Sequence, residues 1–432
     1  MLSPEGLYPG VHDVVQALGV VRPAAGAASV ASLVTGVLLG PSLRRAELGR
    51  AQASERSVPA RQRYLRVARG LTRPWLSSAE LTPHLIRAAL AVVDDPVPHL
   101  AMDTVRCGAW ESITVGIVWH GRVLPIGWEV LPYPWPKGQF TPTVVRLLWR
   151  ISAAWPDERR PHLVADRGFP SLVLFRTLEQ LGWGWTLRLR AKLTVGVEGT
   201  ARHLRDLLAQ ARPGVWTGQA ITYGTGRQRV SGHLVLGRGD ALPILPQHQA
   251  NPGSARQRRR QQVARQQEVR GKHPERRASL AEQTDGWLIL FTSHADWLSA
   301  SRSYTRRWSA EGSYRDAQGG YDGRHGWNLE DTLERLTDPA LVDRVFGLWA
   351  LGTLVQSWIG HRLGDTHVPD AVREVRAQWT TSGRLSVWMR GRFALTDPSD
   401  SLHPWLLDTL AALPLRLRTA PLPTPHSLVD AA

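Results

Sequence analysis

The stretch Pro98–Leu131, which reads PHLAMDTVRCGAWESITVGIVWHGRVLPIGWEVL, decides the fold. Its apolar residues recur at a period of two, which is typical of β-strands. The dipeptide His120-Gly121 predicts a tight turn between two of these strands. Three strand-like runs follow one another, His99–Cys107, Ser112–His120 and Arg122–Leu131. The stretch therefore predicts an antiparallel meander.

Helices and strands alternate after the meander. Apolar spacing predicts a helix, a strand, a helix and a strand in turn, at Thr141–Ala154, His162–Ala165, Pro170–Leu181 and Trp183–Leu189. The order β-β-β-α-β-α-β is the connectivity of the ribonuclease-H-like fold, a mixed sheet with helices on its faces. We therefore expect an α/β protein of this kind.

Changes of pattern divide the 432 residues into five regions. The expected regions are a helical N-terminal domain (1–95), the first part of the α/β domain (96–192), a β-rich insertion (193–285), the second part of the α/β domain (286–330) and a C-terminal helical region (331–432). Helical spacing marks Val11–Leu18, Ala28–Leu39, Arg61–Leu71, Leu81–Val93, Tyr304–Gln318 and Leu329–Leu363. Further strands are expected at Gln219–Tyr223, Gln228–Leu236 and Trp287–Thr292.

The net charge of +16, with a sequence pI near 11.0, favours a polyanionic partner. Nearly all of the positive charge is arginine, since Lys137, Lys192 and Lys272 are the only lysines. GC-rich coding would explain the ratio of arginine to lysine, but it leaves the net excess unexplained. The planar guanidinium grips phosphate oxygens in pairs, so nucleic acid is the favoured partner.

Almost half of the excess charge lies in the segment 251–279, which has nine basic and two acidic residues and a net charge of +7. Its basic residues are Arg256, Arg258, Arg259, Arg260, Arg265, Arg270, Lys272, Arg276 and Arg277. Such a block is either a solvated loop or an arm that grips phosphates, and the two interpretations are compatible.

The single cysteine, Cys107, excludes an intramolecular disulfide and a cysteine-based zinc cluster, which fits a reducing cytoplasm. No run of about 18 apolar residues is present, and the N-terminus lacks the pattern of a signal peptide. We therefore expect a cytoplasmic protein without a membrane segment.

Two aspartates are candidates for a functional site because of their positions in or next to apolar strands. Asp103 is a lone charge in the apolar strand around Leu100–Val105, and Asp166 ends the strand before Arg167-Gly168-Phe169. Each has an ordinary alternative, since buried aspartates accept hydrogen bonds and an aspartate before a glycine forms turns or caps helices. In the expected fold the two strands are neighbours, and two such close carboxylates repel unless a divalent cation lies between them.

A third acidic residue belongs to the motif Tyr304-x2-Arg307-x3-Glu311. On one helix these residues would share a face, which would present an aromatic ring, a cation and a carboxylate together. The ordinary alternative is a surface ion pair of little energetic consequence.

In these motifs the chain resembles the DDE transposases of the insertion-sequence-4 family, whose signature is Y-x2-R-x3-E-x6-K. The resemblance covers roughly residues 95 to 360. It is carried by Asp103-Thr104, Asp166-Arg167-Gly168-Phe169, the strand Trp287–Thr292, and Tyr304, Arg307, Trp308 and Glu311.

The resemblance implies a cut-and-paste transposase in which Asp103, Asp166 and Glu311 hold two Mg²⁺ or Mn²⁺ ions. Water would attack at the end of the element, and the freed 3′-hydroxyl would attack target DNA, with or without a hairpin step. The residues implied to contact DNA are Tyr304, Arg307, Arg315 and Gln318, together with the basic block at Arg258, Arg259 and Arg260. The N-terminal domain would bind the element ends, and the C-terminal region would support a homodimer.

The chain departs from the signature at Gln318, where the family carries lysine. A glutamine can hydrogen-bond a phosphate but cannot neutralise it, so Arg315 could supply the charge, or end binding could be weaker. Two alternatives stay open: a DNA-binding protein of the same fold that no longer cuts, and a nuclease without strand transfer. Relatives also use a tryptophan of the insertion to stabilise a flipped base, for which Trp216, Trp287 and Trp297 are the candidates.

Overall fold

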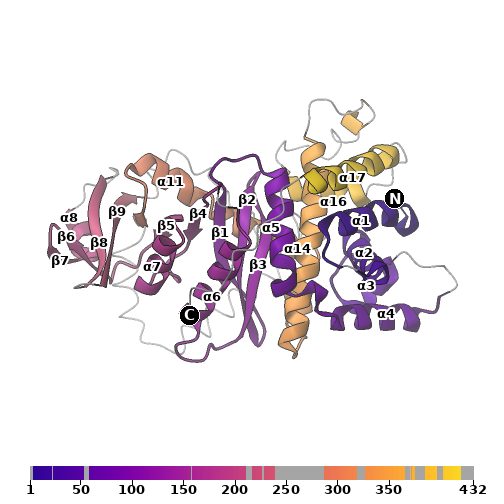
Figure 1. The fold of residues 1–432 in the computed structure, drawn as a ribbon. Coiled ribbons are helices and arrows are strands. Elements are labelled where there is room, and N and C mark those ends of the chain that lie inside the picture. Colours follow the sequence, from indigo (N-terminus) through magenta and orange to yellow (C-terminus); the bar gives the residue numbers. More distant parts are fainter. Residues whose placement is uncertain are drawn as a thin grey trace. The chain divides into compact units, whose positions relative to one another are not determined.

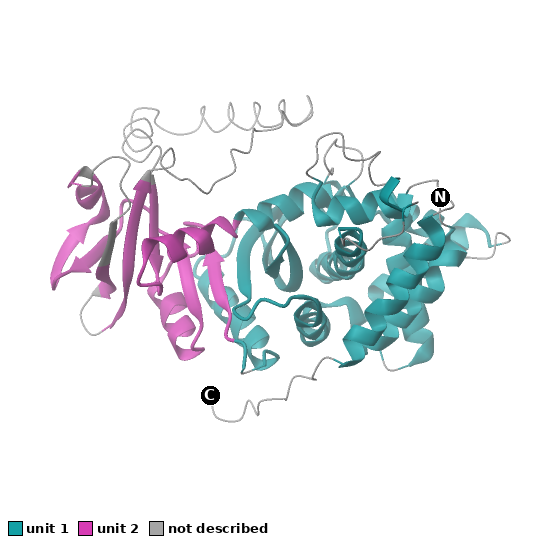
Figure 2. Cartoon of the chain, turned by 90° about the horizontal axis from the view of Figure 1, so that it is seen from above, with its two compact units in different colours: residues 1–159, 308–432 teal, residues 160–307 magenta. Residues whose placement is uncertain are grey.

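The structure is a computed structural model, and it describes residues 3–21, 23–52, 58–156, 158–210, 217–225, 228–238, 287–318, 326–364, 370, 372–374, 385–396 and 402–419. The chain is a mixed α/β protein. It divides into two compact units, residues 1–159 with 308–432, and residues 160–307 (Figure 2). No described helix is both long enough and apolar enough to cross a bilayer.

The first unit combines a three-stranded antiparallel sheet, in the order β3-β2-β1, with helices from both ends of the chain. Its strands are β1 (His99–Cys107), β2 (Trp110–Trp119) and β3 (Arg122–Pro132). Before them come α1 (Pro4–Leu18), α2 (Ala24–Leu39), α3 (Arg45–Ala51), α4 (Ala60–Thr72), the short 3₁₀ helix η1 (Pro74–Leu76) and α5 (Ser78–Val92). After them come α6 (Phe140–Ala153), α12 (Trp308–Gln318), α13 (Leu329–Leu333), α14 (Pro339–Arg362), α16 (Val387–Thr396) and α17 (Leu402–Thr419).

The turn between β2 and β3 confirms the prediction made from His120-Gly121. Both residues have positive φ, 47° and 74°, which is the conformation of a tight hairpin turn that suits the twist of the strands. Glycine adopts this conformation without a steric cost, so the dipeptide directs the chain back on itself.

Helix α14 is the centre of the first unit. Its buried residues run almost without interruption from Leu341 to Gly360, because it packs on β3 and on α2, α5, α16 and α17 at once (Figure 1). A helix that is apolar on all sides is typical of such a central position. Close packing depends on Gly360, where a Cβ atom would overlap the carbonyl oxygen of Val387.

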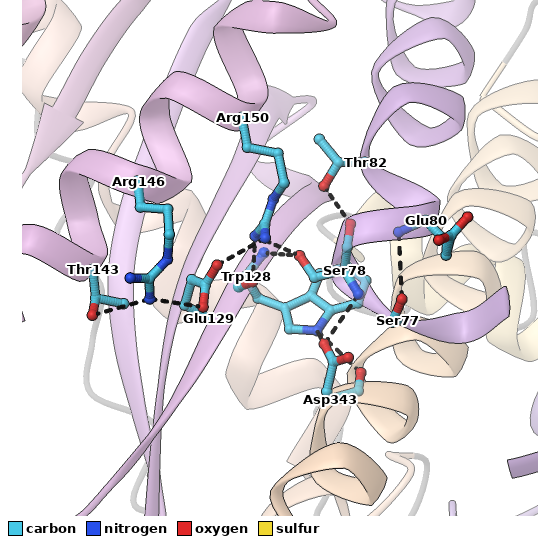
Figure 3. Close-up of polar contacts among 10 residues, drawn as sticks. All are labelled: Ser77, Ser78, Glu80, Thr82, Trp128, Glu129, Thr143, Arg146, Arg150 and Asp343. Carbon is cyan, nitrogen blue, oxygen red and sulfur yellow. Dashed lines mark hydrogen bonds and ion pairs between the residues drawn. The ribbon is translucent and has the colours of Figure 1, made fainter. Parts of the chain in front are cut away.

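Polar contacts join β3 to the helices on both of its faces (Figure 3). The Trp128 indole donates to Asp343 of α14, at 2.6 Å to Oδ1, and the backbone N–H of Ser78 donates to the same oxygen at 3.0 Å. The next residue, Glu129, forms an ion pair with Arg150 of α6 at 2.8 Å. Because successive residues of a strand point to opposite faces, α14 and α6 cover opposite faces of this sheet.

The second unit is built on strands in the order β4-β5-β10-β9-β8-β6-β7. Only β4 and β5 are parallel; the other described pairs in this unit are antiparallel. The strands are β4 (His162–Ala165), β5 (Gly184–Arg188), β6 (Thr194–Val197), β7 (Thr200–His203), β8 (Thr217–Thr225), β9 (Gln228–Arg238) and β10 (Trp287–Thr292). The helices are α7 (Leu172–Gln180), α8 (Leu204–Gln210) and α11 (Trp297–Thr305).

Helices α7 and α11 cover opposite faces of this second sheet. Phe175 of α7 packs edge-on against Phe291 of β10, with ring centroids 4.9 Å apart. The preceding residue, Leu290, belongs to a buried cluster with Val235, Ala300 and Tyr304, and the last two residues are on α11. Since Leu290 and Phe291 are neighbours in a strand, their side chains point to opposite sides of the sheet.

The predicted order from β1 to β5 is confirmed, and so are the predicted helices of the N-terminal region. The predicted strands Gln219–Tyr223 and Gln228–Leu236 lie within β8 and β9, whereas β6, β7 and α8 were not predicted. The basic block 251–279 lies outside the described residues.

One prediction is wrong: Tyr304 and Gln318 do not lie on one continuous helix. Helix α11 ends at Thr305 and α12 begins at Trp308, with a turn between them in which the N–H of Arg307 donates to the carbonyl of Tyr304 at 3.0 Å. Arg307 therefore lies in the turn before α12 and not on a helix that also carries Tyr304. No proline or glycine marks this break, which coincides with the boundary between the two compact units.

Candidate active site

Asp166 directly follows β4, at the carboxyl end of the parallel pair β4 and β5. The backbone forms a turn there, since the carbonyl of Asp166 accepts the N–H of Phe169 at 3.2 Å. The side chain does not cap the next helix, because Ser171 caps α7 by accepting the N–H of Leu174 at 3.2 Å. The Asp166 carboxylate, with 34% of its side chain exposed, is thus available for other contacts.

Two side chains from other elements contact the Asp166 carboxylate. The Tyr304 hydroxyl of α11 donates to Oδ1 at 3.3 Å, and Nη1 of Arg188, the last residue of β5, lies 3.7 Å from the same oxygen. Arg188 is paired with Leu290 across the sheet, so it lies on the face that α11 covers. A cation and a hydroxyl donor therefore lie beside the same carboxylate oxygen.

Tyr304 is almost completely buried, with 2% of its surface exposed. Burial raises the pKa of the Tyr304 hydroxyl to about 12, so the group keeps its proton and donates at any ordinary assay pH. The guanidinium of Arg307 lies 5.6 Å from the centre of the Tyr304 ring and is itself buried. The contact of either side chain with DNA stays a prediction, while the contact of Tyr304 with Asp166 is an observed geometry.

Sequence reasoning missed Arg188 as a partner of Asp166. The signal was present, since Arg188 is a charged residue within the apolar run Trp185–Leu189, just as Asp103 is within its own strand. A charge in such a run is favourable only when a partner lies near.

Asp103 lies in the middle of β1, in the first unit. It is paired with Thr114, and Thr114 is paired with Trp128, so the three side chains point to one face of the sheet. That face is the one covered by α14, which Trp128 contacts through Asp343. The Asp103 Oδ1 atom accepts the backbone N–H of Thr104 at 2.9 Å.

Glu311 belongs to the first turn of α12, which packs on β1, β2 and β3. Tyr314, one turn later, stacks on Trp349 of α14 with ring centroids 5.5 Å apart, so α12 and α14 lie on the same side of the sheet. Ser313 Oγ accepts the N–H of Val123 at 2.8 Å, which ties α12 to the start of β3. Asp103 and Glu311 therefore lie on the same side of the first unit's sheet.

The remaining predicted residues of this region differ in exposure. Arg315 is exposed on α12, and Asp316 beside it is buried in an ion pair with Arg122 at 2.6 Å. The Gln318 side chain accepts the N–H of Glu330 at 2.7 Å and so caps the N-terminus of α13. Its carbonyl oxygen is therefore engaged in the fold. Arg258, Arg259 and Arg260 lie outside the described residues.

The three acidic residues are carboxylates, the oxygen ligands that Mg²⁺ and Mn²⁺ prefer. Each is partly exposed rather than deeply buried, which suits ligands that a cation must reach. Within the described ranges, no three His, Cys, Asp or Glu side chains form a ready-made metal site. Asp103 and Glu311 belong to the first compact unit and Asp166 to the second.

Helix α4 presents a basic surface in the first unit. Only Val67, Gly70 and Leu71 of this helix are buried, and the helix contains no acidic residue. Arg61, Arg66 and Arg69 are exposed. An exposed helix with this charge fits the electrostatics of a polyanion.

The tryptophans proposed for base flipping have different positions. Trp297 opens α11 with 36% of its surface exposed, and Trp287 opens β10. Trp216 and the side chain of Trp287 lie outside the described part of the chain.

No model of a known protein family matches the chain, and no curated protein matches it either. Its function is therefore inferred from its own residues and their geometry, together with the resemblance of its motifs.

Proposed function

We propose that this protein is a DNA transposase, which binds the ends of an insertion sequence, cleaves them and joins them to target DNA. Asp103, Asp166 and Glu311 would hold two Mg²⁺ or Mn²⁺ ions in a ribonuclease-H-like catalytic domain. The acidic triad and its motifs support metal-dependent cleavage and joining of phosphodiesters. The excess of arginine supports DNA as the substrate.

The contact between Tyr304 and Asp166 carries the proposal. The two residues belong to separate motifs, 138 positions apart in the chain, and the hydroxyl of one donates to the carboxylate of the other. A contact between the two motifs is what a shared site requires. Donors that orient a carboxylate from behind are typical of metal-binding sites.

Asp103 and Glu311 support the same conclusion from the first unit. Both lie on one side of the sheet, and both are partly exposed carboxylates, which suits ligands that a divalent cation must reach from solvent.

The bound metal ions would neutralise charge on the attacking and leaving oxygens of the phosphodiester. The chain's own residues have other tasks. Tyr304 keeps its proton and orients Asp166, and Arg188 balances the negative charge of that carboxylate. Hydrolysis at the element end leaves a 3′-hydroxyl and a 5′-phosphate, and the hydroxyl then replaces a target oxygen at phosphorus.

DNA binding would involve several basic surfaces. The exposed arginines of α4 are suited to hold the duplex of an element end, and Arg315 of α12 is suited to a phosphate near the cut. The block 251–279 would add a further arm, and the C-terminal helices would support a homodimer.

The test uses the full chain with labelled DNA that carries the sequences flanking its own gene, in Mg²⁺, Mn²⁺ or chelator. Wild-type protein should yield 3′-nicked and joined products only with metal. Asp103→Asn, Asp166→Asn and Glu311→Gln should each abolish both products. Asp206→Asn, which changes an exposed acid of α8 in the second unit, should leave them intact.

The alternatives give different results in the same experiment. Metal-dependent nicking without joined products would indicate a nuclease. Binding without any cleavage would indicate a DNA-binding protein that keeps the fold, for which Gln318 in place of lysine is the supporting observation. Full activity of any triad variant would overturn the proposed site.

A further inference from the structure

A loop of the first unit exposes two large aromatic rings. It connects β3 to α6, and residues 132–139 are all exposed. Tyr133 and Trp135 have 37% and 38% of their surface exposed. Exposed rings that lie side by side are typical of a binding surface, since a folded chain otherwise tends to bury them.

Contacts within the loop hold the two rings in place. Trp135 stacks on Phe140 with centroids 4.2 Å apart, and Tyr133 lies edge-on to Trp135 at 6.4 Å. The N–H of Tyr133 donates to the carbonyl of Ala109 at 2.8 Å. The rings are therefore arranged before any partner arrives, which lowers the entropic cost of binding.

Positive charge accompanies the rings. The guanidinium of Arg106, near the end of β1, lies 3.8 Å from the centre of the Tyr133 ring, and Lys137 is exposed in the loop. Residues 132–140 include no acidic side chain. Flat aromatic surfaces next to cations suit a ligand that has flat rings and negative charge together.

A protein partner fits this surface less well. Stable protein interfaces bury roughly 800 Å² on each side, far more than two rings provide. One or two stacked bases, in contrast, are enough for measurable binding of a single strand.

We propose that Tyr133 and Trp135 stack the unpaired bases of a single-stranded nucleic acid segment, while Arg106 and Lys137 contact its phosphates. The inference rests on the proposed function in one respect, the DNA substrate. Arg106 follows Asp103 by three residues on β1, a distance of about 10 Å along a strand. Because the two residues are an odd number of positions apart, their side chains point to opposite faces of the sheet, so nucleotides held there would lie on the face opposite Asp103.

The experiment measures fluorescence anisotropy of a labelled oligothymidylate and of a blunt duplex of equal length, at raised salt so that phosphate contacts contribute less. Trp135→Ala should weaken oligothymidylate binding about tenfold and duplex binding by less than about twofold. Trp135→Phe should recover most of the loss. Trp149→Ala is the matched control, because Trp149 of α6 is equally exposed, at 38%, but lies outside the loop.

Equal oligothymidylate affinities of Trp135→Ala and Trp149→Ala would overturn the inference, as would an equal loss for single strand and duplex. Circular dichroism would verify that each variant is folded. Failure of the proposed function is a separate outcome. If Trp135→Ala loses single-strand binding selectively but the wild-type protein never cleaves DNA, base stacking by the loop is supported and the proposed transposase activity is refuted.

Discussion

The Asp166 carboxylate lies between a cation and a hydroxyl, both supplied by residues distant in sequence. Arg188 Nη1 and the Tyr304 hydroxyl approach the same oxygen, Oδ1, at 3.7 Å and 3.3 Å. Both contacts would orient the carboxylate before the proposed metal ion binds. Partners of this kind tune the affinity of metal ligands in general.

Tyr304→Phe should raise the metal concentration needed for half-maximal cleavage by about tenfold, because the donor that orients Asp166 is lost while the buried ring is kept. The free energy of unfolding should fall by no more than about 1.5 kcal/mol. A titration of cleavage with Mn²⁺ measures the metal requirement, and urea unfolding measures the free energy of unfolding.

Tyr314→Phe is the control for this change, since the Tyr314 ring stacks on Trp349 in the first unit. An unchanged metal requirement in Tyr304→Phe would show that Tyr304 does not position Asp166.

Gln318→Lys should have two opposing effects. Loss of the acceptor for the Glu330 N–H should cost about 1 kcal/mol of stability, as loss of a helix cap does. The new charge should tighten binding to the cognate DNA end by at most about 1 kcal/mol, since an exposed contact competes with solvent. Thermal unfolding and end-binding titrations measure the two effects separately.

Gln318→Met removes the same acceptor without adding a charge, so its comparison with the lysine variant isolates the phosphate contact. If the two variants bind the end equally well, the side chain at this position does not face phosphate. Arg315 would then be the better candidate for the missing charge.

At the scale of elements, the half-buried carboxylate of Asp343 holds α5, β3 and α14 together. Asp343 accepts from the Trp128 indole and from the Ser78 N–H, and burial raises the pKa of Asp343 above its ordinary value. The folded protein therefore holds this proton more tightly than the unfolded chain does. The contribution of Asp343 to stability is fully present below the unfolded pKa and is lost as the pH rises through the folded pKa.

Asp343→Asn should consequently be at least as stable as the wild type at neutral pH, because the amide oxygen can still accept while no charge is buried. The advantage of the variant should shrink as the pH falls. Unfolding by urea between about pH 5 and pH 8 measures it.

Asp343→Leu is the contrasting variant. It leaves the Ser78 N–H without its acceptor and should lose about 1–3 kcal/mol at every pH. A destabilisation of Asp343→Asn that grows with rising pH would contradict the assigned direction of the pKa shift.

At the scale of the whole molecule, the charge of +16 is unevenly spread along the chain. The segment 251–279 carries +7, and α4 adds four arginines without an acid. Both regions are candidates for contact with phosphate, and each contact releases counterions from DNA.

Deletion of 251–279 should weaken binding to any DNA sequence and flatten the dependence of log affinity on log salt. Joint replacement of Arg61, Arg66 and Arg69 by alanine should reduce the slope by about 2 to 3, since each lost phosphate contact contributes about 0.9. Titrations at several salt concentrations measure both slopes. An unchanged slope in either variant would exclude that region from phosphate contact.

The sequence by itself determined the elements from β1 to β5 and the helices of the N-terminal region. Their signals are local: alternation along a strand, helical spacing, and the turn at His120-Gly121 arise from residues close together in the chain. The bounds of β1 and β4 agree with the prediction for the same reason. Asp103 and Asp166 were singled out because they lie in or directly after an apolar strand, and Glu311 because of its motif; metal binding by the three residues stays a prediction.

Only the tertiary structure decided what these residues contact. The break between α11 and α12 has no local marker, since Thr305-Arg306-Arg307-Trp308 contains no helix breaker. The pairing of Arg188 with Asp166, the donation from Tyr304 and the capping of α13 by Gln318 likewise join residues that the fold brings together. The sequence shows where burial of a polar group would cost free energy. Which residue contacts that group and offsets the cost depends on the packing of elements that are far apart in the chain.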